Sequence, residues 1–194
     1  GTRKPKLICV EKGDTTKLHH SIVMDIGTTT VWGQLLDLTE GRVIAEASDY
    51  NAQISYGEDV ITRIVYSLKE GGLEKMQSLV VGTMNKIIKE LMEKSGPEEV
   101  RISHLTAAGN TTMTQLLLGV SPKYLRESPY TPTANFFPPV RAVNLGLDVP
   151  EHVYLYTFPC VASYVGGDIV AGILASGVYQ RPEVTLYIDI GTNG

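Results

Sequence analysis

The chain has 194 residues, 43% of them hydrophobic, with a formal net charge of −4 and a pI near 5.6. This length supports one or two domains with a packed core, and the slight acidic excess gives no electrostatic reason to expect nucleic acid or an anionic membrane as a partner. Every long hydrophobic stretch is interrupted by Gly, Asp or Lys before it reaches bilayer-spanning length, and no charged and then hydrophobic leader opens the chain. We therefore expect a cytoplasmic protein.

Three short strands are predicted after residues 1–20, which are Lys-rich and weakly periodic, like a linker or an edge strand. The strands cover residues 21–26, 31–38 and 42–50, and Gly41 stands in the turn before the third strand, where reverse turns favour glycine. This pattern predicts an antiparallel meander.

Two helices are predicted next, over residues 58–69 and 73–94, with Gly71-Gly72 between them. The second helix has hydrophobic residues at the three-and-four spacing of an amphipathic helix. They are Met76, Leu79, Val80, Met84, Ile87, Ile88 and Leu91. The helix is expected to end at Ser95-Gly96-Pro97, since Gly caps helices and Pro cannot continue them.

The second half of the chain alternates strands with helices. Strands are expected over residues 102–107 and 153–158, and helices over 112–118 and 167–176. The last helix is rich in Gly and Ala, which favours close packing on a sheet. Residues 121–150 are rich in Pro and aromatic residues and predict an ordered excursion without regular structure.

A short turn sequence occurs twice, as Asp25-Ile26-Gly27-Thr28 and as Asp189-Ile190-Gly191-Thr192. Each copy follows a hydrophobic run typical of a buried strand, and the two aspartates are 164 residues apart. One copy is a common turn, but two indicate an internal repeat. Glycine allows close backbone approach, hydroxyls donate hydrogen bonds, and aspartate suits hydrated Mg²⁺, so the pair predicts a polyphosphate site.

The element order predicts an α/β, ribonuclease-H-like lobe with a mixed sheet flanked by helices, followed by the first strand of a second lobe. The chain thus resembles the actin-like (ASKHA) ATPase superfamily, in which two lobes enclose ATP. We expect residues 1–20 to be the linker, 21–180 the first lobe and 181–194 the truncated start of the second. Because the chain ends within a phosphate-type turn, we expect it to be a fragment of a longer protein. In the resemblance, residues 167–177 join the lobes.

The resemblance also implies the roles of individual residues. Asp25, Asp168 and Asp189 are the catalytic candidates, with Asp25 and Asp189 holding Mg²⁺ through water and Asp168 positioning a water molecule. The residues expected to bind ATP are Gly27, Thr28, Thr29, Thr30, Asn110, Thr111, Gly191, Thr192, Asn193 and Gly194. Asp168 and the turn at Asn110 have a structural alternative, because both residue types cap helices.

Four segments resemble, more specifically, the reductive activators of corrinoid proteins. They are residues 51–64, 108–113, 166–169 and 187–194. The resemblance implies an ATP-dependent activator that reduces Co(II) to Co(I) in a corrinoid protein partner, with an N-terminal [2Fe–2S] domain in the parent protein. This chain would supply half of the ATP and Mg²⁺ site and be inactive alone. Its only cysteines, Cys9 and Cys160, have no C-x-x-C spacing and are interpreted as passive thiols.

Two other functions stay open on the sequence: a small-molecule kinase of the same superfamily, and a non-catalytic lobe that binds a partner. Gln53, Asp59 and Arg63 form a polar stripe at the first helix, either lining the cleft or a partner surface, or making an Asp59–Arg63 surface salt bridge. A homodimer through the C-terminal strand is a further expectation, because an unpaired strand edge pairs readily.

Overall fold

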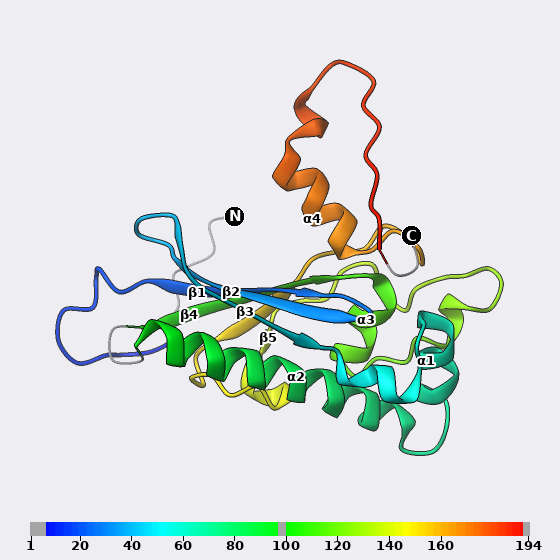
Figure 1. Cartoon of the computed structure of the whole chain (residues 1–194), viewed down its shortest axis with the longest axis horizontal. Helices are drawn as coiled ribbons and strands as arrows, with labels where there is room; N and C mark the ends of the chain where they lie inside the picture. Colours follow the sequence, from blue (N-terminus) through cyan, green and yellow to red (C-terminus); the bar gives the residue numbers. More distant parts are fainter. Residues whose placement is uncertain (1–6, 97–99, 192–194) are drawn as a thin grey trace.

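The computed structural model describes residues 7–96 and 100–191. Its centre is a mixed six-stranded sheet with the order β3-β2-β1-β4-β6-β5 (Figure 1). The strands are β1 (His20–Ile26), β2 (Thr30–Asp37), β3 (Arg42–Tyr50), β4 (Ile102–Gly109), β5 (Val140–Arg141) and β6 (Tyr154–Thr157). The first three strands form the predicted antiparallel meander, whereas β1 pairs in parallel with β4 and β4 with β6. This arrangement confirms the predicted α/β, ribonuclease-H-like fold.

Helix α2 (Gly72–Ser95) covers one face of the sheet (Figure 1). The predicted hydrophobic stripe faces the core, with Leu79 partly buried and the other members buried. Gly33 in β2 allows the close approach, because a Cβ atom there would lie 2.5 Å from a methyl group of Ile87. Burial of this stripe is the main source of stability for such a helix.

Shorter helices surround the carboxyl ends of β1 and β4. These are α1 (Val60–Ser67), α3 (Thr111–Leu117) and the 3₁₀ helix η1 (Ala52–Tyr56). Helix α1 begins later than predicted because Asp59 caps it: its carboxylate accepts a hydrogen bond from the Thr62 backbone N–H at 2.8 Å. Residues 121–150 are irregular apart from β5 and two 3₁₀ helices, η3 (Lys123–Leu125) and η4 (Ala142–Leu145).

The C-terminal part differs from the prediction. Helix α4 (Gly167–Ser176) projects from the sheet, followed by η5 (Val178–Gln180), and only Gly167 of α4 is buried (Figure 1). The prediction that residues 181–194 begin a second lobe with a strand is wrong for the described part, because residues 184–190 run as an extended but unpaired segment (Figure 1). They run back alongside α4, with the Tyr187 ring against Gly172.

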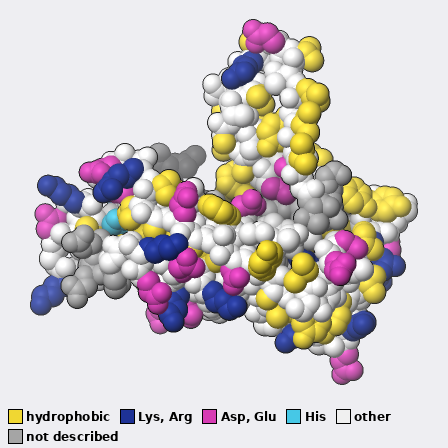
Figure 2. Space-filling model, viewed as in Figure 1, with side chains coloured by type: hydrophobic (Ala, Val, Ile, Leu, Met, Phe, Trp, Pro, Cys, Tyr) yellow, Lys and Arg dark blue, Asp and Glu magenta, His cyan; other side chains and the backbone are white. Residues whose placement is uncertain are grey.

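The unpaired segment leaves hydrophobic side chains open to solvent. Val184, Leu186, Ile188 and Ile190 are all exposed on the projection that α4 and this segment form (Figure 2). A strand needs a neighbouring strand for its backbone hydrogen bonds, and among the described residues none lies beside this segment. Among the same residues, no helix is long and hydrophobic enough to cross a membrane.

Candidate functional site

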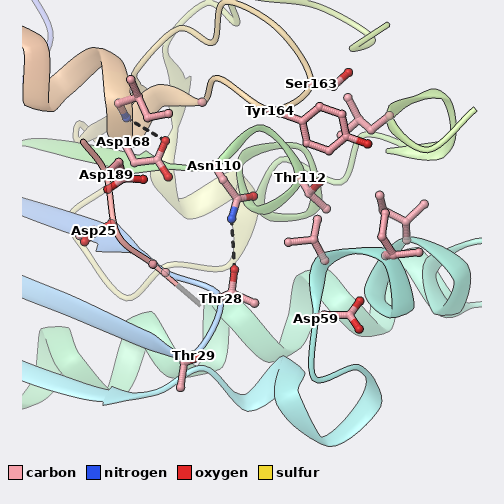
Figure 3. Close-up of a pocket in the computed structure, with 18 of the residues that line it drawn as sticks. Asp25, Thr28, Thr29, Asp59, Asn110, Thr112, Ser163, Tyr164, Asp168 and Asp189 are labelled. Atoms are coloured by element: carbon pink, nitrogen blue, oxygen red, sulfur yellow. Dashed lines mark hydrogen bonds between the residues drawn. The ribbon is translucent and has the colours of Figure 1, made fainter. Parts of the chain in front are cut away.

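A cavity of about 630 Å³ lies where the projection meets the ends of β1 and β4 (Figure 3). Its lining comes from the loop after β1, the first half of α1, the turn before α3, the end of η3, and the foot of the projection. The predicted site residues that line it are Asp25, Gly27, Thr28, Thr29, Thr30, Asn110, Asp168, Asp189 and Gly191. Segments far apart in the sequence are thus brought to one site.

The loop after β1 makes a tight turn into β2. A Cβ atom at Gly27 would lie 2.5 Å from the Thr30 carbonyl oxygen, so only glycine fits this turn. Ile26 and Gly109 are partners in the parallel pair of β1 and β4, which places Asn110 beside the loop. The Asn110 side chain joins the two elements, since its Nδ2 donates to Thr28 Oγ1 at 3.2 Å (Figure 3).

Asn110 has the capping role that the sequence offered as a structural alternative, and it also lines the cavity. Its Oδ1 accepts a hydrogen bond from the Met113 backbone N–H at 3.0 Å and caps α3, while its amide nitrogen bonds Thr28. Thr111, by contrast, does not line the cavity: it is buried, and its hydroxyl donates to the Ala162 carbonyl at 2.8 Å. Thr112 lines the cavity instead.

Three carboxylates gather on one side of the cavity, those of Asp25, Asp168 and Asp189 (Figure 3). Burial raises the pKa of Asp25, and the negative charges of Asp168 and Asp189 raise it further. The pKa of Asp168 is also raised, mainly by burial and in part by Asp189, against the lowering effect of a hydrogen bond from the Ile169 backbone N–H. Burial and neighbouring negative charge therefore disfavour the ionised forms of Asp25 and Asp168.

Asp168 is not the N-cap of α4, because Gly166 has that position. Its Oδ1 nevertheless accepts the Ile169 N–H at 2.8 Å, within the first turn of the helix. Thr192, Asn193 and Gly194, which were expected to bind nucleotide, lie outside the described residues.

The sequence did not predict the hydrophobic part of the lining, which includes Ile61, Ile64, Leu125, Tyr164 and Ile169. The polar stripe of Gln53, Asp59 and Arg63 at the first helix predicted only part of the lining on this side of the cavity. Asp59 lines the cavity, but Arg63 and Gln53 are fully buried behind it. The surface salt bridge is wrong, since Arg63 Nη1 donates to Gln53 Oε1 at 3.1 Å and Asp59 caps α1.

The mixed sheet, with a polar loop at the end of its first strand, defines a lobe of the α/β, ribonuclease-H-like fold. The RACo middle region family matches residues 20–181, and the chain belongs to this family. The chain is 31% identical to the corrinoid activation enzyme RamQ of Eubacterium limosum over 187 residues, which is 95% of this chain and 31% of RamQ. A solved structure of a reductive activator for corrinoid, iron-sulfur protein is 41% identical, with a TM-score of 0.89 over 95% of this chain and 30% of that protein. The chain thus spans about a third of the length of each.

Proposed function

We propose that this chain is one part of a longer, ATP-dependent reductive activator that restores Co(I) in a corrinoid methyl-transfer protein, and that its cavity forms half of the ATP site. The names of the two relatives and their identity over 95% of the chain support the activator. The observation that carries the nucleotide site is the convergence of the Gly27–Thr30 loop with Asp25 and Asp189 at one cavity.

The residues fit a polyphosphate with a divalent cation. Backbone N–H groups and the hydroxyls of Thr28 and Thr29 donate hydrogen bonds of the kind that phosphate oxygens accept. Phosphate brought beside three carboxylates would be repelled, so a cation is needed between the two sets of oxygens. Mg²⁺ suits this position, because it usually keeps several waters and binds through one or two carboxylates.

The donor arrangement favours binding of that cation through water. Among residues 7–96 and 100–191, no three His, Cys, Asp or Glu side chains are close enough to hold a metal ion directly. Asp25 and Asp189 would then orient a hydrated Mg²⁺, and Asp168 would orient the attacking water. Phosphoryl transfer depends mainly on such positioning and charge stabilisation.

The electron for Co(II) would come from a [2Fe–2S] cluster in another part of the full-length activator. Cys9 is exposed and Cys160 is buried, and burial raises the pKa of the Cys160 thiol. Two separated cysteines do not provide the four ligands of a [2Fe–2S] cluster. ATP turnover at the cavity would drive transfer of one electron from that cluster to the cobalt of the corrinoid partner.

Two substitutions in the full-length activator test this function. Asp25→Ala and Asp189→Ala should each abolish ATP-dependent formation of Co(I), followed by the absorbance of the corrinoid, with circular dichroism unchanged. The matched control is Asp148→Ala, which removes an exposed aspartate outside the cavity. Mg-ATP titration by calorimetry should show binding to the full-length protein and weak or no binding to this chain alone. Wild-type activation rates in both cavity variants would refute the proposal.

A further inference from the structure

The carbonyl groups of the loop after β1 are held from the buried side. The Gly27 carbonyl accepts a hydrogen bond from Asn51 Nδ2 at 2.9 Å, and the Thr29 carbonyl accepts one from the Asn51 backbone N–H at 2.8 Å. Between them, the Thr28 carbonyl accepts a hydrogen bond from Arg63 Nη2. Asn51 and Arg63 are both fully buried, and neither lines the cavity. The loop therefore lies between these two residues and the cavity.

These hydrogen bonds to the carbonyl groups also fix the direction of the loop's N–H groups. In a trans peptide the carbonyl and the following N–H point in opposite directions. Holding the carbonyls of Gly27 and Thr28 toward the core thus turns the N–H groups of Thr28 and Thr29 to the opposite side, where the cavity is. A loop fixed in this way presents donors to an anion without reorganising on binding.

Arg63 also brings a positive charge behind the loop. Its guanidinium bonds neutral oxygens, including Gly57 O at 2.8 Å and Gln53 Oε1 at 3.1 Å. Among the described residues, no carboxylate lies within ion-pair distance of it. Burial lowers the pKa of Arg63 to about 10, so the group remains charged near neutral pH.

A buried cation that makes no ion pair among the described residues is costly for folding, although the negative charge of Asp59 raises the pKa of Arg63 and offsets part of that cost. This arrangement therefore needs a role that a hydrophobic side chain would not fill. We propose that Arg63, together with Asn51, is a positioning residue that orders the Gly27–Thr30 loop for a polyphosphate and adds positive charge beneath it, without touching the ligand. This inference rests on the proposed nucleotide function.

The contrary interpretation is that Arg63 only joins η1, α1 and the loop as part of the core. The two interpretations differ in how the effect depends on phosphate. A positioning residue affects ligands in proportion to their phosphates, whereas a core residue affects all ligands of the site alike. Adenosine, ADP and ATP therefore form the informative series.

The experiment compares Arg63→Met and Arg63→Lys in the full-length activator, by calorimetric titration with adenosine, Mg-ADP and Mg-ATP. Arg63→Met should weaken ATP binding by roughly tenfold to a hundredfold and leave adenosine binding unchanged. Arg63→Lys keeps the charge but not the planar fork of donors, so it should recover part of the loss. It also provides the test if Arg63→Met does not fold.

The control is Val80→Ala. Val80 is a fully buried residue of α2 that does not line the site, so its truncation leaves a small cavity in the core. It should lower the unfolding temperature without changing the ratio of ATP to adenosine affinity. Equal losses for adenosine and ATP in the Arg63 variants, or no loss for either, would overturn the positioning role alone. Absence of ATP binding by the wild-type activator would overturn the proposed function and this inference together.

Discussion

Thr28→Val removes one hydroxyl from the centre of the loop and keeps the side-chain volume. Thr28 is only 7% exposed, so the valine has little freedom to move. In the structure, Thr28 Oγ1 accepts a hydrogen bond from Asn110 Nδ2, which leaves its O–H to donate into the cavity. A nucleotide phosphate would accept that hydrogen bond.

The expected magnitudes separate binding from stability. A hydrogen bond to a charged group contributes about 1.5–3 kcal/mol, which corresponds to roughly a tenfold to a hundredfold loss of ATP affinity. The lost bond from Asn110 is long and neutral, at 3.2 Å. Water in the cavity can replace it, so the free energy of unfolding should fall by at most about 1 kcal/mol.

The assay is calorimetric titration of the full-length activator with Mg-ATP, together with urea unfolding. The matched control is Thr114→Val in α3, where the hydroxyl donates to the Gly109 carbonyl at 3.3 Å and does not line the cavity. The control should lose a similar amount of stability and no ATP affinity. If Thr28→Val bound ATP as tightly as the wild type, the loop would not contact the phosphates through this hydroxyl.

Three further outcomes follow from the site and its surroundings. The Asp25 carboxyl has a pKa of 3.8 in the unfolded chain and a raised pKa in the folded chain. Between these two pKa values, the carboxyl is therefore protonated in the folded chain and ionised in the unfolded chain. The free energy of unfolding should therefore fall as pH rises through that window, and Asp25→Asn should reduce this fall and raise the unfolding temperature of the ligand-free protein near pH 7. Gly27→Ala should weaken ATP binding and lower the unfolding temperature, because its Cβ would lie 2.5 Å from the Thr30 carbonyl oxygen. The isolated chain should form concentration-dependent dimers in light scattering through residues 184–190, and lysine at both Leu186 and Ile188 should return it to a monomer.

Each of these outcomes has a matched control on the same chain. Asp148→Asn should leave the pH dependence unchanged, since this aspartate lies outside the cavity. Gly82→Ala, in the middle of α2 with no neighbouring atom within 4 Å, should not destabilise the protein. Thr185→Lys should leave the dimer intact if its hydrophobic neighbours form the contact. A pH-independent wild type, unaffected ATP binding in Gly27→Ala, or a strictly monomeric chain would contradict the respective reasoning.

The sheet could be predicted from the sequence because its strands carry their own signal. Short hydrophobic runs separated by turn residues predicted β1, β2 and β3 within about one residue of their ends, and Gly41 marked the turn before β3. The segment 184–190 has an equally hydrophobic pattern but forms no strand. Pairing depends on a neighbour, and local sequence does not report whether a neighbour is present.

The residues that line the cavity were predictable where a turn follows a strand. They were less predictable at the start of a helix, where the rotation of each residue around the helix axis determines which side chain faces the cavity. Successive residues of an α-helix differ by about 100° in direction. Thr111 and Thr112 therefore face different surroundings, and the sequence alone does not say which faces the cavity. The burial of Arg63 was hidden for a related reason, because its partners on η1 and the loop are remote in sequence.

The charges around the cavity have an order that bears on how a nucleotide would lie. Asp25, Asp168 and Asp189 lie on one side of the cavity (Figure 3). The guanidinium of Arg63 lies behind the loop that forms another part of the cavity wall. The negative charges of Asp168 and Asp189 already raise the pKa of Asp25, which means that these groups repel one another. A phosphate without a cation would add further repulsion if it lay near the carboxylates. Phosphate over the loop, with a hydrated cation between it and the carboxylates, satisfies both sets of charges. Under the proposed function, this arrangement would let a cavity lined by four aspartates, three of them on one side, accept a polyanion, and the cation and the nucleotide should then bind together.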